Sequence, residues 1–92
     1  MIKSFKDRKA EKLYRGESVK EYSGFERQAI WRLQILDSAS SLDDLKQLPS
    51  NRFKALKGNR KGQYSISINK QWRICFKWYQ DNPQEVEITD YH

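Results

Sequence analysis

Hydrophobic and polar residues alternate along the last third of the chain, which is the pattern of strands that bury one face. Asn tolerates positive φ better than most residues, so Asn69-Lys70 is a predicted hairpin turn between two such strands. Asp81-Asn82-Pro83 is the predicted turn before a third strand. The residues expected to face the core are Tyr64, Ile66, Ile68, Trp72, Ile74, Phe76, Trp78, Val86 and Ile88.

A helical period replaces this alternation between residues 21 and 40. The apolar residues that repeat there at four, four and three positions are Phe25, Ala29, Leu33 and Leu36. Ser23 and Glu26 have the spacing of a capping box and predict the start of the helix. Further apolar residues widen the stripe, and this surplus either covers the sheet or meets a partner protein; it consists of Ile30, Trp31 and Ile35.

The remaining elements are short. Ile2 to Phe5 alternates apolar with polar and predicts a strand at the edge of the sheet. Asp7 is expected to cap a helix that ends at Gly16, and Ser41 a shorter helical segment before Pro49. Helices precede an antiparallel meander, so we predict one α+β domain over residues 1–92, with N-terminal helices packed on one face of a small antiparallel sheet.

Composition narrows the class of protein. The chain has 92 residues, of which 37% are hydrophobic and 13% aromatic, enough for one small core. No apolar run approaches the roughly 18 residues of a membrane span, and the start lacks the apolar segment of a secretory signal. One cysteine (Cys75) cannot form an internal disulfide, and with one histidine it cannot complete a zinc site. We therefore expect a cytoplasmic protein without metal, cofactor or membrane contact.

Charge is distributed very unevenly along the chain. The stretch 52–73 contains seven basic residues and no Asp or Glu: Arg52, Lys54, Lys57, Arg60, Lys61, Lys70 and Arg73. Of 18 basic and 12 acidic residues in total, the rest of the chain holds 11 and 12, so it is nearly neutral. A basic face can serve solubility alone, but glycines and aromatic residues inside this stretch favour the approach of a phosphate backbone. The stretch predicts binding of nucleic acid.

The strand alternation also predicts which polar residues share a face. Those expected on the uncovered side of the sheet are Ser65, Ser67, Arg73, Lys77, Thr89 and Tyr91. A basic loop from Lys54 to Lys61 leads into this face. The chain then ends at Asp90, Tyr91 and His92, which brings its single histidine beside the basic surface. A terminal tripeptide is often frayed and inert, and that interpretation competes with a functional one.

These residue types suit metal-independent cleavage of RNA, in which the 2′-hydroxyl attacks the adjacent phosphate. His92 is the candidate acid or base because imidazole titrates near neutrality. Arg73 can clamp a phosphate, and Lys54 and Lys57 can stabilise charge or, if desolvated, transfer protons. Tyr91 can stack on a nucleotide. Asp90 can orient a neighbour, although its strand parity differs from that of Tyr91.

Four fragments in order resemble the HigB branch of the RelE-like bacterial toxins, and the resemblance covers nearly the whole chain. They are Met1-Ile2-Lys3-Ser4-Phe5, then Leu56-Lys57-Gly58-Asn59-Arg60 with Gly62 and Ser65-Ile66, then Trp72-Arg73-Ile74, and finally Asp90-Tyr91-His92. The resemblance implies a fold of helices on an antiparallel sheet. It also implies an endonuclease that cuts mRNA in the ribosomal A site and is neutralised by a helix-turn-helix antitoxin (HigA-like).

Carried over by position, the resemblance implies an active site of Lys57, Arg73, Asp90, Tyr91 and His92. Some relatives have a second histidine where this chain has Lys54, so a scheme with two imidazoles does not transfer. The residues expected to bind RNA or the ribosome are Arg52, Lys57, Arg60, Lys61, Lys70 and Gln71. Contact with DNA is expected only through the antitoxin.

Two other functions are compatible with the same residues. Toxins of the ParE type share the superfold, bind gyrase and cleave no RNA, although a pure protein binder has no need of a terminal histidine beside a cationic face. A non-catalytic RNA-binding accessory of the ribosome is the other alternative. Expression that stops translation with cut mRNA, that damages DNA, or that does neither distinguishes the three.

Overall fold

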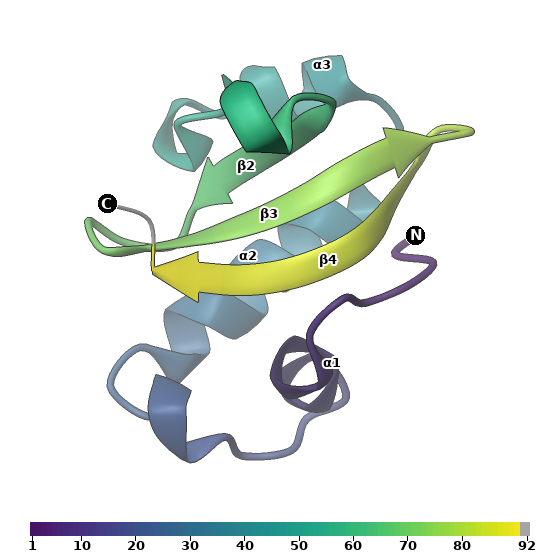
Figure 1. Cartoon of the computed structure of the whole chain (residues 1–92). Coiled ribbons are helices and arrows are strands. Elements are labelled where there is room, and N and C mark those ends of the chain that lie inside the picture. The colour runs from purple at the N-terminus through teal and green to yellow at the C-terminus, as the bar shows by residue number, and fades with distance from the viewer. Residues whose placement is uncertain (91–92) are drawn as a thin grey trace.

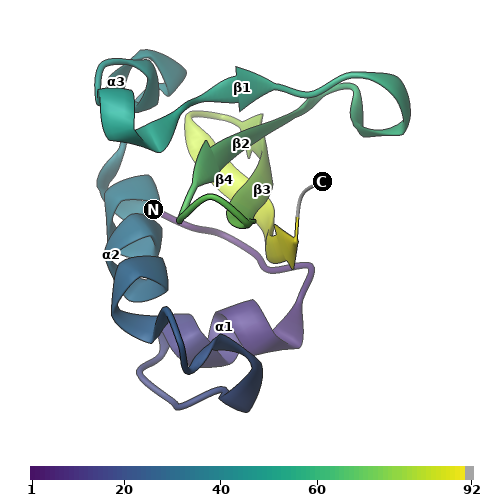
Figure 2. The ribbon, with the colours of Figure 1, turned by 90° about the vertical axis from the view of Figure 1, so that its left-hand side faces the viewer.

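A computed structural model describes residues 1–90 and has helices packed on one face of a four-stranded antiparallel sheet (Figures 1 and 2). The strands follow the order of the chain and are β1 (Lys54–Ala55), β2 (Gln63–Ser67), β3 (Trp72–Tyr79) and β4 (Asn82–Asp90). The α-helices are α1 (Arg8–Tyr14), α2 (Glu26–Ser38) and α3 (Leu42–Lys46). Three short 3-10 helices connect them: η1 (Lys20–Tyr22), η2 (Pro49–Asn51) and η3 (Gly58–Arg60). The predicted α+β class is confirmed.

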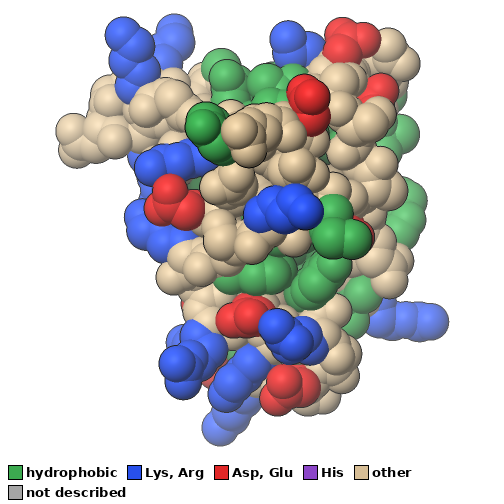
Figure 3. Space-filling view, turned by 90° about the vertical axis from the view of Figure 1, so that its right-hand side faces the viewer, with side chains coloured by type: hydrophobic (Ala, Val, Ile, Leu, Met, Phe, Trp, Pro, Cys, Tyr) green, Lys and Arg blue, Asp and Glu red, His purple; other side chains and the backbone are tan. Residues whose placement is uncertain are grey.

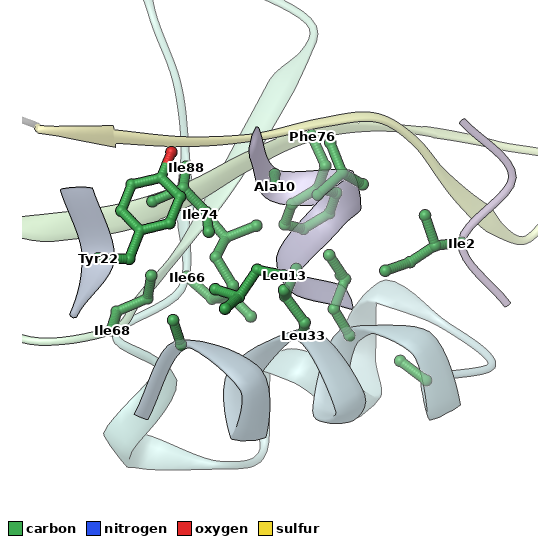
Figure 4. Close-up of a cluster of buried hydrophobic side chains, with 14 of the residues drawn as sticks. Ile2, Ala10, Leu13, Tyr22, Leu33, Ile66, Ile68, Ile74, Phe76 and Ile88 are labelled. Atoms are coloured by element: carbon green, nitrogen blue, oxygen red, sulfur yellow. The ribbon is translucent and has the colours of Figure 1, made fainter. Parts of the chain in front are cut away.

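The core lies between the sheet and the two longer helices, α1 and α2 (Figure 4). Ile66, Ile74 and Phe76 from β2 and β3 are fully buried, as are Leu13 of α1 and Leu33 of α2. The predicted alternation of the strands is thereby confirmed. Tyr64, Trp72 and Trp78 pack at the margin of this cluster and are only half-buried. Within residues 1–90, none of the helices combines the length and the apolar character needed to cross a membrane.

Helix α1 begins and ends as its sequence predicts. Asp7 accepts a hydrogen bond from the backbone N–H of Lys9 at 2.9 Å and so caps the first turn. At the other end Gly16 has φ +91° and donates to the carbonyl of Leu13, while Glu17 donates to that of Lys12. This pair of bonds is a Schellman motif, which places glycine in the left-handed region. Ser41 likewise caps α3, accepting from the N–H of Asp44 at 3.2 Å.

The predicted capping box of α2 is wrong. Ser23 has helical backbone angles and ends η1, and α2 starts at Glu26 after Phe25 without a side-chain cap. The Phe25 ring instead stacks on Trp72 of β3, with centroids 5.1 Å apart. Aromatic packing onto the sheet therefore sets the start of this helix, and the extra 3-10 turn moves Ser23 away from the capping position.

Residues 2–5 do not form the predicted strand, although they lie at the predicted edge of the sheet. Residues 2–6 run beside β4, where Lys3 donates to the carbonyl of Pro83 and Val86 donates to that of Ser4. Only one parallel bridge forms, between Phe5 and Val86. Pro83 has no N–H to donate, so a continuous ladder is interrupted at this edge.

Both hairpin turns differ from their predictions. Gln80 and Asp81 have φ of 50° and 63°, so they form the two-residue turn between β3 and β4, and Asn82-Pro83 already belongs to β4. In the earlier turn Asn69 does not have positive φ. Its Oδ1 accepts from the N–H groups of Gln71 and Trp72, each at 2.8 Å. The asparagine thus stabilises a longer turn through its side chain instead of its backbone angles.

A β-bulge interrupts the alternation of inward and outward residues in β4. Glu85 has φ 50°, and the register between β3 and β4 shifts between Cys75 and Lys77. Pro83 is buried before the bulge, and Val86 and Ile88 are buried after it. One extra residue therefore allows both halves of the strand to face the core.

Candidate RNA-binding and catalytic face

Two of the predicted site residues in the strands, Lys54 and Arg73, lie on the sheet face opposite α1 and α2. Directly paired residues in antiparallel strands share a face. One row across the sheet contains Lys54, Ser65, Cys75 and Glu87, and the next contains Ser67, Arg73 and Thr89. The predicted parity is confirmed for these residues.

This face is less open than the sequence predicts. Ser65 is fully buried and Ser67 and Arg73 are only 7% and 8% exposed. The Arg73 guanidinium covers the serines, and Arg60 of η3 reaches across the sheet to Glu87 of β4. Long basic side chains from β3 and η3 thus close the centre of this face, whereas Lys54 of the edge strand β1 and Lys77 of β3 are exposed.

Arg73 is held rigidly by neighbouring oxygen atoms. Its Nε donates to the Ser65 hydroxyl at 2.8 Å, and its Nη2 donates to the carbonyl of Arg52 and, at 3.4 Å, to that of Ser65. These bonds fix the orientation of the planar guanidinium within the protein, and Arg73 as a whole is only 8% exposed.

Lys54 lies in a strand, whereas the sequence predicted a loop from Lys54 to Lys61. As part of β1 it pairs with Ser65 of β2, and the hydroxyl of this serine accepts a hydrogen bond from Arg73. Its neighbour Lys57 is exposed and immediately precedes η3. The two-residue length of β1 explains the error, because so short a strand has no detectable alternation.

The other predicted RNA-binding residues divide into two groups. Arg52, Lys61 and Lys70 are exposed at the edges of the face. Arg60, in contrast, forms an ion pair with Glu87 at 3.2 Å and donates to Gln63 at the same distance. Its charge is thereby partly compensated within the protein.

The end of β4 brings the last described residue beside the turn before β3. Asp90 pairs with Trp72 and therefore lies on the opposite face from Arg73, as its parity predicts. The Gln71 side-chain amide donates to the Asp90 carboxylate at 3.0 Å. Tyr91 and His92, the other predicted catalytic residues of this strand, lie outside the described residues.

Two buried polar residues near the site were missed by sequence reasoning. Arg32 of α2 donates to the Asn51 side chain at 2.6 Å, and Asn51, fully buried, donates to the carbonyl of Leu45 at 3.0 Å. Arg52 follows in a left-handed conformation (φ 45°, ψ 51°) and offers its carbonyl to Arg73. A polar pair separated by 19 residues leaves no periodic signal, so only the fold reveals it.

Cys75 lies in the centre of the face but is not suited to nucleophilic chemistry. It is fully buried, and burial raises the pKa of its thiol above the ordinary value. Among residues 1–90, no group of three or more His, Cys, Asp or Glu side chains comes together as a metal site would require.

Charge elsewhere on the molecule is mixed. On the side shown in Figure 3, Lys and Arg side chains stand beside Asp and Glu side chains over much of the surface. The ion pairs Lys9–Glu21 (2.6 Å) and Arg15–Glu11 (3.0 Å) are examples away from the sheet. The uncompensated positive charge therefore belongs to the region of residues 52–73.

Solved structures share this architecture. The toxin–antitoxin complex of YoeB and YefM from Staphylococcus aureus contains a chain that matches with a TM-score of 0.60 at 18% identity, covering 100% of this chain and 95% of the other. A YafQ variant from E. coli matches with a TM-score of 0.59 at 14% identity, covering 98% and 91%. At such identities the likeness establishes the fold alone.

Sequence comparisons identify the family within this fold. The family model described as the RelE-like toxin of type II toxin–antitoxin system HigB matches residues 3–92. Toxin HigB-1 of Vibrio cholerae is 40% identical over 80 residues, which cover 85% of this chain and 84% of the relative. Endoribonuclease HigB of Proteus vulgaris is 34% identical over 96 residues, covering 100% of both. The chain belongs to the HigB-like toxins of type II toxin–antitoxin systems, as the sequence fragments predicted.

Proposed function

We propose that this HigB-like toxin is an endoribonuclease that cuts mRNA in the ribosomal A site without a metal ion. The main support is the full-length similarity to a relative named as an endoribonuclease. The sheet adds a physical reason, because Lys54 and Arg73 belong to one face of it: Lys54 is the cross-strand partner of Ser65, and Ser65 accepts a hydrogen bond from Arg73. Cations on such a face stabilise charge that develops on a reacting phosphate.

The reaction follows from the groups available. A base removes the proton of the ribose 2′-hydroxyl, the 2′-oxygen bonds to the adjacent phosphorus, and the bond to the 5′-oxygen breaks as that oxygen takes up a proton. The products are a 2′,3′-cyclic phosphate and a 5′-hydroxyl. We assign His92 to proton transfer because it is the single imidazole of the chain, and Arg73 to charge stabilisation.

The remaining predicted residues support this step. Lys54 and Lys57 supply further positive charge, with Lys54 taking the place of the second histidine of some relatives. Tyr91 stacks on the displaced nucleotide, and Asp90, held by Gln71, orients the end of the strand. Arg52, Lys61 and Lys70 hold the RNA backbone or the ribosome, and Arg60 contributes less because Glu87 compensates it.

Dependence on the ribosome follows from the size of the protein. A chain of 92 residues has few elements that can hold an RNA strand in a reactive geometry, so the ribosome must supply the positioning. The test is primer extension on one mRNA incubated with purified toxin, either free or bound to ribosomes. We expect cuts in the A-site codon of bound mRNA and an intact free mRNA. Equal cleavage of free mRNA at the same sites, or damage to DNA without RNA cleavage, contradicts the proposal.

We further propose that a helix-turn-helix antitoxin of the HigA type binds the outer surface of α2. Trp31 is 53% exposed there, and the Arg32 guanidinium lies 4.7 Å from the centre of its ring. An exposed tryptophan backed by a fixed cation is a typical interface anchor. An antitoxin bound at this position makes the toxin too large to enter the ribosome. Contact with DNA is made by the antitoxin and not by the toxin. Hydrogen exchange should show protection over α2, whereas protection confined to residues 54–73 and 89–92 contradicts this choice of surface.

A further inference from the structure

A cleft of about 320 Å³ is lined in part by Arg52, whose carbonyl accepts a hydrogen bond from Arg73. Its walls come from the first half of α2, from the segment around η2 and from the turn between β2 and β3. The polar residues that line it are Gln28, Ser50, Arg52, Ser67, Asn69 and Lys70. None of them belongs to the proposed catalytic group, and Ile68 completes the lining.

The chemistry of this lining fits one nucleotide. Arg52 and Lys70 supply two positive charges, and no Asp or Glu is among the described residues that line the cleft. The Gln28 amide and the Ser50 hydroxyl can both donate and accept hydrogen bonds, as a base edge and a ribose require. The volume is at the lower end of the range of about 300–1,000 Å³ for ligand pockets. A double helix is much too large for such a space.

Both walls of the cleft are fixed without a ligand. On one side the buried Arg32–Asn51–Leu45 bonds hold the chain immediately before Arg52. On the other side Asn69 accepts two backbone N–H groups, and the Ser67 hydroxyl donates to the carbonyl of Asn69 at 2.8 Å. A preformed site loses less conformational entropy on binding than a mobile loop does.

The cleft is also joined directly to the proposed catalytic face. The carbonyl of Arg52 accepts a hydrogen bond from Arg73, and Ser67 is the cross-strand partner of Arg73. Two residues of the cleft are therefore direct neighbours of Arg73: Arg52 by a hydrogen bond and Ser67 by strand pairing. The cleft therefore borders Arg73, the residue to which we assign the reacting phosphate.

We propose that this cleft binds one nucleotide of the mRNA next to the scissile bond. Arg52 and Lys70 contact its phosphate, and Gln28 and Ser50 contact its base or ribose. The inference rests on the proposed RNA cleavage for its biological role, but binding in the cleft is measurable without cleavage.

The first test is an NMR titration of the toxin with a single-stranded RNA tetranucleotide, free of ribosomes. We expect amide shifts at Gln28 and at residues 67–70, and weaker binding by Lys70→Ala and Gln28→Ala. The slope of log affinity against log salt should fall by about 0.7 in Lys70→Ala, the value for one phosphate contact in single strands. Lys12→Ala, an exposed lysine on α1, is the matched control. Absent shifts at 67–70, or equal affinities of the Lys70 and Lys12 variants, overturn the proposal.

The second test uses ribosome-bound mRNA and separates binding from chemistry. The double variant Gln28→Ala, Lys70→Ala should raise KM about tenfold at an unchanged kcat, because it removes contacts made equally before and during the reaction. An unchanged KM overturns the cleft as an mRNA site. If the wild-type protein cuts no RNA, the proposed function is wrong. The NMR titration would still show whether the cleft binds a nucleotide.

The third test identifies the occupant on the ribosome. Ser50→Cys, exposed at the cleft, can carry a photo-crosslinker, and the buried Cys75 should remain unlabelled. We expect crosslinks to mRNA from this position and none from the same label at Lys12→Cys. Crosslinks from Ser50→Cys only to ribosomal RNA or to a ribosomal protein overturn the assignment to mRNA.

Discussion

Removal of the Asn51 side chain is the sharpest test of how the site is supported. Asn51 is fully buried and makes two hydrogen bonds, accepting from Arg32 at 2.6 Å and donating to the carbonyl of Leu45 at 3.0 Å. Arg32 is only 7% exposed, and this burial lowers the pKa of its guanidinium. In Asn51→Ala the guanidinium loses its acceptor at a position where solvent cannot fully replace it.

The expected loss of stability follows from these two bonds. A bond from a charged donor contributes about 1.5–3 kcal/mol, and a neutral one about 1 kcal/mol. Asn51→Ala should therefore reduce the free energy of unfolding by about 3 kcal/mol, a large part of the roughly 5–15 kcal/mol typical of a small domain. Ser50→Ala, the exposed neighbouring position, should change it by less than about 0.5 kcal/mol.

Urea denaturation of a double-mutant cycle measures the effect. Arg32→Met removes the charge, so Asn51→Ala in that background should cost about 1.5–3 kcal/mol less than in the wild type. The single and double variants should unfold with equal m-values, because a changed m-value would indicate a departure from two-state unfolding or a changed denatured state. If the two single losses add to within about 0.5 kcal/mol in the double variant, the bond does not stabilise the fold as described.

Three further predictions concern the site. Arg73→Ala should lower the single-turnover cleavage rate about a hundredfold or more, the effect of losing one transition-state donor, and wild-type rates would contradict its role. His92→Ala should lower that rate by about 10²–10⁴, whereas Lys54→Arg should retain most of it; the reverse order would transfer the proton chemistry to Lys54. Because the pKa of Cys75 is raised in the folded state, the wild type should lose stability as pH rises from about 8.5 through the raised folded value. This loss should be smaller in Cys75→Ala, and equal pH dependence by urea denaturation would refute the buried-thiol explanation.

The sequence predicted elements whose signal is local and periodic. Asp7, Gly16 and Ser41 cap their helices as expected, because a cap depends on residues within one turn. The core faces of β2 and β3 likewise follow from alternation. The order of helices before a meander was then enough to predict the fold class.

Features that depend on distant residues were not predictable in this way. The bulge at Glu85 appears only when β4 pairs with β3, and Phe25 begins α2 only because Trp72 lies opposite. Burial of Ser65 and Ser67 depends on Arg73, whose length allows it to cover a face that alternation alone presents as open. The Asn51–Arg32 pair and the cleft beside it require the packed fold. The roles of Tyr91 and His92 remain predictions from sequence.

The most direct measurement replaces one ribonucleotide at the mapped cut site of ribosome-bound mRNA by its 2′-deoxy analogue. Attack by the 2′-hydroxyl is then impossible at that bond, while the charge of the backbone, which we propose that Arg73 binds, is unchanged. We predict that the toxin cuts the all-ribose mRNA to a 2′,3′-cyclic phosphate and leaves the substituted bond intact. Cleavage of the substituted bond at a comparable rate would contradict the proposed mechanism.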